Sequence, residues 1–396
     1  MMFHLIEYTL SSIMLWRTLL IILVIASLAR HFNIPYEVGL VAAGFIATFI
    51  APESLPMVAP NVFLDLLLPP MIFHTALHLN VRSVLENGKF MYGYALIGTI
   101  SSAILMAIIG RSLLGLDLRS AILLGVIISP TDPVAVVSIM SRIGTPQKLR
   151  EIIEGEALFN DGAAIAIFTV ISRTSSNNIN LLSDLYEVVI SLAIGHIVGF
   201  LVGYFTSKVA KRITKDVLVQ TVLSFFALYT SYELASIIGE GGIIGSAVVG
   251  LIIGNMHLNR ATYEAYETID SNWEFIDFLI TSFSFVLIGS LVNIQNLYSS
   301  IFIALIAFVA VLATRTITIF GLTKLLNFGE NRISNRWQAV ISFAGLRGVV
   351  SLMLALTLSL TPASKLIDIV FGIVLFSLVF QGLTMGWLIP KMLKRS

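Results

Sequence analysis

Thirteen apolar stretches follow one another along the chain, most of them about twenty residues long. The hydrocarbon core of a bilayer is about 30 Å thick, so a helix needs roughly 20 apolar residues to cross it. The pattern therefore predicts a series of membrane-spanning helices. The expected spans are approximately 12–30, 35–50, 61–78, 89–110, 119–141, 149–172, 182–208, 216–238, 242–257, 270–293, 298–324, 336–359 and 366–389.

The composition points to the same class of protein. Hydrophobic residues make up 57% of the 396 residues, charged residues make up 12%, and the mean hydropathy is +0.93. A soluble domain carries about 25% charged residues, so most of this surface is expected to face lipid. The net charge of +1 suggests no polyanionic partner such as nucleic acid. The absence of cysteine excludes disulfides, thiolate metal sites and thiol catalysis.

The organisation is predicted to be one all-α, polytopic transmembrane domain over 1–396, without a cleaved signal peptide or a soluble regulatory domain. Most Lys and Arg residues fall in loops after odd-numbered spans, and cytoplasmic loops carry such an excess. The N-terminus is therefore expected outside and the C-terminus in the cytoplasm. The odd number of spans allows two inverted six-helix repeats, about 12–172 and 216–389, joined by a linker helix at 182–208.

The fifth span is interrupted by Ser129-Pro130-Thr131-Asp132-Pro133. The two prolines remove two backbone donors and leave carbonyl groups without helical partners. A broken helix would place carbonyl oxygens and helix ends beside Asp132, which suits cation coordination. Thr-Asp-Pro also fits an ordinary helix cap at a membrane surface, although apolar residues flank this motif on both sides.

The sixth span carries acidic and amide groups at membrane depth: Glu154, Glu156, Asn160 and Asp161. Glu154 and Asp161 are seven residues apart and share one helix face, whereas Glu156 and Asn160 are four apart and share another. An ionisable group inside a membrane costs a few kcal/mol and tends to mark an ion or proton pathway. Asp161 is the strongest candidate, because an uncharged run follows it.

The twelfth span contains Gly345-Leu346-Arg347-Gly348 within an apolar run. A buried arginine needs an anionic partner or a water-filled cavity, so Arg347 is predicted to have a structural role, an ion-path role, or both. The fifth and twelfth spans each stand fifth in their own half. They are therefore predicted to be broken, crossing helices that form a binding site near the membrane midplane.

These three motifs resemble the signature of the NhaP-type monovalent cation/proton antiporters, prokaryotic relatives of the animal sodium/proton exchangers. The Leu68-Pro69-Pro70 run and the thirteen spans fit the same family. The resemblance implies that Asp161 binds either the cation or the proton and that Thr131 contributes oxygen to the Na⁺ site. Asp132 would balance the exposed helix ends, and Glu156 would form a buried ion pair with Arg347.

The resemblance also bears on stoichiometry and on regulation. Asn160 stands where electrogenic relatives carry a second aspartate, which implies electroneutral one-for-one exchange. Ala157 stands where many relatives carry serine, so one oxygen ligand is expected to be missing. His74 replaces an acidic residue and is expected to modulate the pH response or to pack. His74 and His78 have zinc-ligand spacing, but no further ligand is evident from the sequence.

The predicted function is that of a secondary antiporter exchanging Na⁺ or Li⁺ for H⁺, and not that of an enzyme. It needs no cofactor, because cation and proton compete for Asp161. The expected setting is the cell membrane, as a multi-pass homodimer. A K⁺/H⁺ antiporter of the same fold, an organic-anion symporter and a cation channel remain as alternatives. Arg315, in the eleventh span, is paired with Asp277 as a further expectation.

Overall fold

The computed structural model describes residues 16–28, 31, 36–50, 59–173, 181–213, 216–255, 260–291, 294–329, 331–358 and 363–394. Helices dominate this part of the chain, and it contains no β-strand. Six helical stretches in this part of the chain are long and apolar enough to cross a membrane, and two of them, Val81–Ser112 and Leu366–Leu393, include a π-helical turn. The predicted start of the first span, 12–15, lies outside the described residues.

Each predicted span corresponds to one helix or to one run of helical segments. Three spans contain a π-helical turn, labelled η1 to η3. In chain order the elements are Trp16–Leu28; α2 Tyr36–Ile50; α3 Pro60–Val62, η1 Phe63–Leu67 and α4 Leu68–His78; α5 Val81–Tyr92, η2 Gly93–Gly98 and α6 Thr99–Ser112; α7 Leu118–Ile127 and α8 Pro133–Arg142; α9 Gln147–Arg173; α10 Leu181–Ile213; α11 Val217–Gly239; α12 Gly242–Gly254; α13 Arg260–Ser290; α14 Ile294–Leu326; α15 Asn335–Phe343 and α16 Val349–Leu356; α17 Ala363–Phe376, η3 Ser377–Gly382 and α18 Leu383–Lys394.

The fifth and twelfth spans are broken where the motifs predict. Between α7 and α8 the chain leaves the helix, and Asp132 then caps α8 by accepting a hydrogen bond from the Val134 N–H at 3.0 Å. Pro133 is the first residue of α8. The N–H of a residue at this position has no acceptor within the helix, so proline costs the helix no hydrogen bond. Between α15 and α16 the chain is non-helical from Gly345 to Gly348. The prediction of two broken helices is therefore confirmed.

The two breaks contact each other. The Asp132 N–H donates to the Leu346 carbonyl at 2.9 Å, a backbone hydrogen bond that joins the two halves of the chain. A Cβ atom at Gly348 would lie 2.9 Å from the Asp132 Cβ, closer than such atoms normally approach. Glycine at this position therefore allows the crossing to close.

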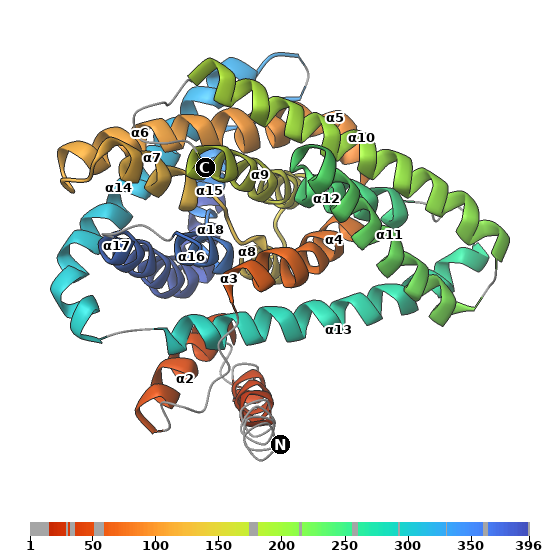
Figure 1. Ribbon diagram of the computed structural model, residues 1–396, viewed down its shortest axis with the longest axis horizontal. Helices are drawn as coiled ribbons and strands as arrows, with labels where there is room; N and C mark the ends of the chain where they lie inside the picture. The colour runs from red at the N-terminus through yellow and green to blue at the C-terminus, as the bar shows by residue number, and fades with distance from the viewer. Residues whose placement is uncertain are drawn as a thin grey trace.

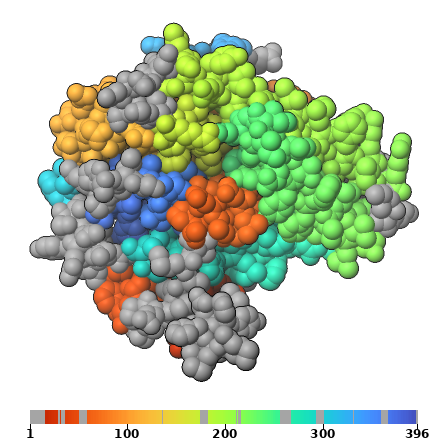
Figure 2. Space-filling model, in the orientation of Figure 1, coloured from red at the N-terminus to blue at the C-terminus, as the bar shows by residue number. Residues whose placement is uncertain are grey.

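The broken helices lie inside the molecule. In Figure 1, α4, α8, α9 and α16 occupy the middle of the view, with α13 along one side and α5, α6 and α10 along the other. In the space-filling view, the orange segment near residues 60–80 reaches the surface between the green α11 and α12 and the blue C-terminal helices (Figure 2). The outer helices present large apolar side chains, such as Phe200, Phe226 and Ile237, as expected of a surface that faces lipid.

Candidate functional site: a carboxylate cavity at the helix crossing

A small cavity lies beside the helix crossing. Water can occupy about 40 Å³ of it, enough for more than one molecule. Three carboxylates line the cavity: Asp132 from the first break, Asp161 from α9 and Asp277 from α13. The other lining residues are Leu68, Met71, Ile72, Thr75, Pro130, Thr131, Pro133, Val134, Gly348, Val349 and Val350.

Asp161 and Thr131 provide the free oxygens of this cavity. Asp161 lies in the middle of the long helix α9 and is only 6% exposed. Its Oδ1 atom and the Thr131 hydroxyl are buried, and neither has a hydrogen-bond partner within the described part of the chain. Buried polar atoms in folded proteins nearly always have a partner. Two unpaired oxygens at one cavity are therefore candidate ligands for a cation.

Asp132 differs from Asp161 because its carboxylate already has a structural task. One of its oxygens caps α8, and the residue lies directly against Gly348 of the second break. An anionic cap at a helix N-terminus is stabilised by the positive end of the helix dipole. Asp132 therefore supports the crossing, while its carboxylate still adds negative charge to the cavity.

Asn160 lies in a second, separate cavity with Thr99, Ser129 and Glu156. Its side-chain amide donates to the Ser129 carbonyl at 2.7 Å and to Glu156 Oε1 at 3.4 Å. Its carbonyl oxygen accepts a hydrogen bond from the Thr99 hydroxyl. Asn160 is thus fully engaged, and the structure does not bring it together with Asp161 at one cavity even though the two are sequence neighbours.

Glu156 forms a buried ion pair with Arg315 of α14, not with Arg347. Two guanidinium nitrogens of Arg315 donate to the two carboxylate oxygens, at 3.1 and 2.9 Å, and both side chains are almost inaccessible to water. Gly345 permits this approach, because a Cβ there would lie 2.2 Å from Arg315 Nε. The predicted pairing of Glu156 with Arg347 is therefore wrong.

Arg347 instead neutralises the first break. Its guanidinium donates to the carbonyls of Ser129 at 2.7 Å and Pro130 at 3.2 Å. The backbone N–H of Arg347 donates to the hydroxyl of Ser377 at 2.9 Å. Pro133 has no N–H to donate to the Ser129 carbonyl, and the Val134 N–H binds Asp132 instead of the Pro130 carbonyl. Arg347 lies in the facing break, where it can reach both carbonyls. This is the physical reason why Arg347 does not need Glu156.

Asp277 lines the cavity, although the sequence analysis did not predict it to be part of the site. One of its oxygens lies 3.3 Å from His74 Nδ1, and both side chains are largely buried. The predicted pairing of Arg315 with Asp277 is wrong, because Arg315 is bound to Glu156. A signal existed: Asp277 is an acidic residue within an apolar span, and such residues tend to face a cavity or a partner.

Two other predicted positions do not line the cavity that contains Asp161 and Thr131. His74 contacts Asp277 and is not among the residues that line the cavity. Ala157 is buried on α9 and lines neither of the two cavities described above. The structure therefore brings together Thr131, Asp132 and Asp161 from the sequence prediction, and adds Asp277 to them.

The sequence pattern of the family described as "Sodium/hydrogen exchanger, transmembrane" matches residues 18–391. The chain belongs to this family. The Na⁺/H⁺ antiporter ApNhaP of Aphanothece halophytica is 33% identical over 366 residues, a match that covers 91% of this chain and 70% of that one. The low-affinity Na⁺/H⁺ antiporter NhaS1 of Synechocystis is 31% identical over 364 residues, covering 89% and 68%.

The fold is also found among solved structures. The sodium proton antiporter MjNhaP1 from Methanocaldococcus jannaschii superimposes with a TM-score of 0.81 over the whole of both chains, at 21% sequence identity. This likeness confirms the predicted all-α antiporter fold. The predicted membership of the exchanger family, made from the three motifs, is confirmed by the family match.

Proposed function

We propose that the chain exchanges Na⁺ for H⁺ across a membrane, with Asp161 as the shared binding group. The observation that carries this proposal is a pair of buried oxygens, Asp161 Oδ1 and Thr131 Oγ1, that have no hydrogen-bond partner among the described residues. They lie at a cavity formed where two broken helices cross. Carboxylate, hydroxyl and water oxygens form the kind of shell that small hard cations prefer. Several relatives are named as Na⁺/H⁺ antiporters, which supports sodium over potassium.

The hydrogen bonds of the site determine which of its oxygen atoms remain available to a cation. The carbonyls of Ser129 and Pro130 are occupied by Arg347, so the cation is coordinated by Thr131, Asp161 and water. Protonation of Asp161 removes its charge and releases the cation. If the cavity opens to either side only when Asp161 carries a cation or a proton, transport of one must be coupled to return of the other.

We propose one-for-one, electroneutral exchange. Asn160 carries no charge and lies in a satisfied network apart from the cation cavity. Asp132 is engaged as a helix cap, and Asp277 contacts His74. Asp161 is therefore the carboxylate whose charge is free to alternate between a cation and a proton.

The cavity disfavours the other classes of transporter. An organic-anion symporter needs positive groups at its binding site, whereas this cavity is lined by three carboxylates. The two nearby arginines, Arg315 and Arg347, are already engaged with Glu156 and with the Ser129 and Pro130 carbonyls. A channel needs a continuous polar pore, and this small cavity is lined mainly by apolar and short polar side chains.

The membrane setting is part of the same proposal: a multi-pass homodimer in the cell membrane, with the N-terminus outside and the C-terminus in the cytoplasm. The chain has no cysteine, so a single introduced cysteine can be labelled without background. Arg82→Cys should be labelled only from the cytoplasmic side and Arg111→Cys only from the outside. The opposite labelling would invert the proposed topology. Cross-linking in native membranes tests the dimer.

The transport proposal is tested on purified protein in proteoliposomes that contain a pH-sensitive dye. An inward Na⁺ gradient should drive protons out, and the rate should not change when the membrane potential is clamped with valinomycin and potassium. The same protein on a solid-supported membrane should give no current under a Na⁺ gradient. A current that scales with transport contradicts electroneutral exchange, and proton movement driven equally by K⁺ contradicts the preference for sodium.

A further inference from the structure

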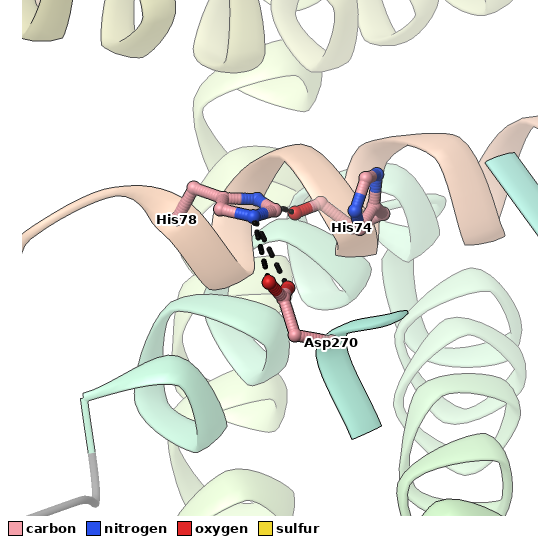
Figure 3. A group of neighbouring side chains, drawn as sticks. All are labelled: His74, His78 and Asp270. Atoms are coloured by element: carbon pink, nitrogen blue, oxygen red, sulfur yellow. Dashed lines mark hydrogen bonds and ion pairs between the residues drawn. The ribbon is translucent and has the colours of Figure 1, made fainter. Parts of the chain in front are cut away.

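Three side chains outside the cation cavity have the chemistry of a transition-metal site. His74 and His78 lie one helical turn apart on α4, and Asp270 faces them from α13 (Figure 3). Each of the three offers one ligand atom, and these atoms all lie within 4.8 Å of one another. Two helices that are far apart in sequence therefore place two imidazoles and one carboxylate together.

His78 already has the hydrogen-bond arrangement of a metal ligand. Its Nδ1 lies 3.1 Å from the His74 carbonyl oxygen, which can only accept a hydrogen bond, so Nδ1 carries a proton. Nε2 is then the nitrogen that would bind a metal ion, in place of the proton that it shares with the Asp270 carboxylate. That Nε2 atom lies 3.1 Å from Asp270 Oδ1 and 3.3 Å from Oδ2. Two ligands about 2.0–2.1 Å from a tetrahedral Zn²⁺ are separated by about 3.3 Å, so the observed spacing fits the ion.

His74 shows a similar arrangement. Its Nδ1 lies 3.3 Å from an oxygen of Asp277, while its Nε2 is buried and has no hydrogen-bond partner within the described residues. A carboxylate on one ring nitrogen commonly orients a histidine that binds metal through the other. Small side-chain rotations would suffice to bring the three ligands around one ion.

We propose that His74, His78 and Asp270 bind a divalent transition-metal ion of the Zn²⁺ type, bridging α4 and α13. Two imidazoles and one carboxylate favour such an ion over Na⁺, which prefers oxygen ligands only. The His78 side chain is 47% exposed, so a water molecule can complete the coordination from solvent. The site lies at the end of α4 that the charge distribution assigns to the cytoplasm.

The metal site is linked to the cation cavity through one residue. Asp277 contacts His74 and also lines the cavity that contains Asp161. A metal held by His74 would fix the orientation of Asp277 and tie α13 to α4. We therefore expect Zn²⁺ to slow exchange. This effect on transport rests on the function proposed above, whereas metal binding itself does not.

Binding is tested on the full chain, purified with a tag that contains no histidine, with Zn²⁺ as the probe. Equilibrium dialysis should give one Zn²⁺ per chain at micromolar concentration, and Co²⁺ should give the visible absorption bands of a tetrahedral site. His78→Gln and Asp270→Asn should each weaken binding at least tenfold. His196→Gln, which removes a histidine of α10 that contacts Tyr92, should bind as the wild type does.

Two outcomes overturn the site: no stoichiometric Zn²⁺ on the wild type, or equal binding by the wild type and both ligand variants. Melting curves without metal show whether each variant is folded, so lost binding is not mistaken for unfolding. In proteoliposomes, micromolar Zn²⁺ should slow Na⁺-driven proton movement by the wild type and His196→Gln, but not by His78→Gln. Bound Zn²⁺ with unchanged exchange would refute the link through Asp277 and leave the binding site standing.

Discussion

Asn160 and Asp161 are neighbours on α9, yet their surroundings are opposite. Every polar atom of the Asn160 side chain has a partner, and those partners come from the first break, from Thr99 and from Glu156. Asp161 has a buried oxygen with no hydrogen-bond partner in the described part of the chain, and it lines a cavity that water can occupy. A satisfied network holds a structure in place, whereas an unsatisfied oxygen is available to a ligand. The contrast separates the scaffold from the proposed site of exchange.

The largest effect on transport is expected when Asp161, the residue with the unpaired oxygen, loses its charge. Asp161→Asn should abolish Na⁺-driven proton movement, because an amide cannot carry the alternating charge. The matched control is Asp117→Asn, since Asp117 caps α7 through the Ser120 N–H and asparagine is an equally good cap. Appreciable exchange by Asp161→Asn in proteoliposomes, at a melting temperature like that of the wild type, would falsify its role.

The next largest effect is expected on stability, when the buried ion pair between Glu156 and Arg315 is broken. Arg315→Gln should destabilise the fold by about 3–5 kcal/mol, because it strands the buried carboxylate of Glu156. Glu156→Gln combined with Arg315→Gln should recover part of that loss, measured by melting in detergent. Arg347→Gln combined with Glu156→Gln should show no such recovery, since these two side chains are not paired. Equal recovery in both double variants would contradict the pairing described here.

A charge introduced at residue 160, in the hydrogen-bonded network around Asn160, should lower the stability of the fold by a smaller amount. Asn160→Asp replaces the amide that donates to the Ser129 carbonyl with a carboxylate, which cannot donate when ionised. We expect a loss of about 1–3 kcal/mol, the usual cost of leaving a buried group unpaired. The loss should shrink at acidic pH, where a protonated carboxyl can donate again. Melting temperatures that do not depend on pH would show that residue 160 is not held in this network.

Thr131→Val tests the second free oxygen and should leave the fold intact. The change keeps the shape of the side chain but removes the hydroxyl, which makes no hydrogen bond to any residue that the structure describes. One lost ligand bond of about 1–1.5 kcal/mol corresponds to roughly a tenfold higher apparent Michaelis constant for Na⁺. The same liposome assay, run as a Na⁺ titration, measures it. An unchanged constant would place Thr131 outside the coordination shell.

Ala157→Ser should have the smallest effect. The sequence suggests a missing oxygen ligand at this position, but Ala157 lines neither cavity. A serine there is expected to hydrogen-bond the helix backbone, with little change in the constants for Na⁺, Li⁺ and K⁺. A clear fall in the Michaelis constant for Na⁺ would restore the ligand role that the resemblance implies.

The helices and the two breaks could be predicted from sequence because each depends on local chemistry. Apolar length sets a span, and Pro130 and Pro133 remove donors wherever they stand. Most helix ends lie within a few residues of the predicted limits; the largest differences are the starts of α13, at Arg260 instead of 270, and of the fourth span, at Val81 instead of 89. The two broken spans each stand fifth in their own half of the chain, and from this position the sequence analysis predicted that they cross.

The partners of the arginines could not be predicted in the same way. Arg315 and Arg347 both stand in apolar runs and both need something to bind, and sequence alone does not say which of them reaches Glu156. The choice depends on how α14 and the second break pack against α9. The unpaired state of Thr131 and Asp161 is likewise a property of the packed structure. Asp277 was assigned to the wrong partner for the same reason.

The backbone hydrogen bond from Asp132 to Leu346 bears on the order of assembly during synthesis. Buried backbone groups need partners, and the Asp132 N–H and the Pro130 carbonyl of the first break find theirs in residues 346 and 347, more than two hundred positions later. While the first half is already in the membrane, its break must stay hydrated or adopt another conformation. The proposed cation site is therefore completed only when the second half arrives, and a chain truncated after the first half would contain Asp161 without this cavity.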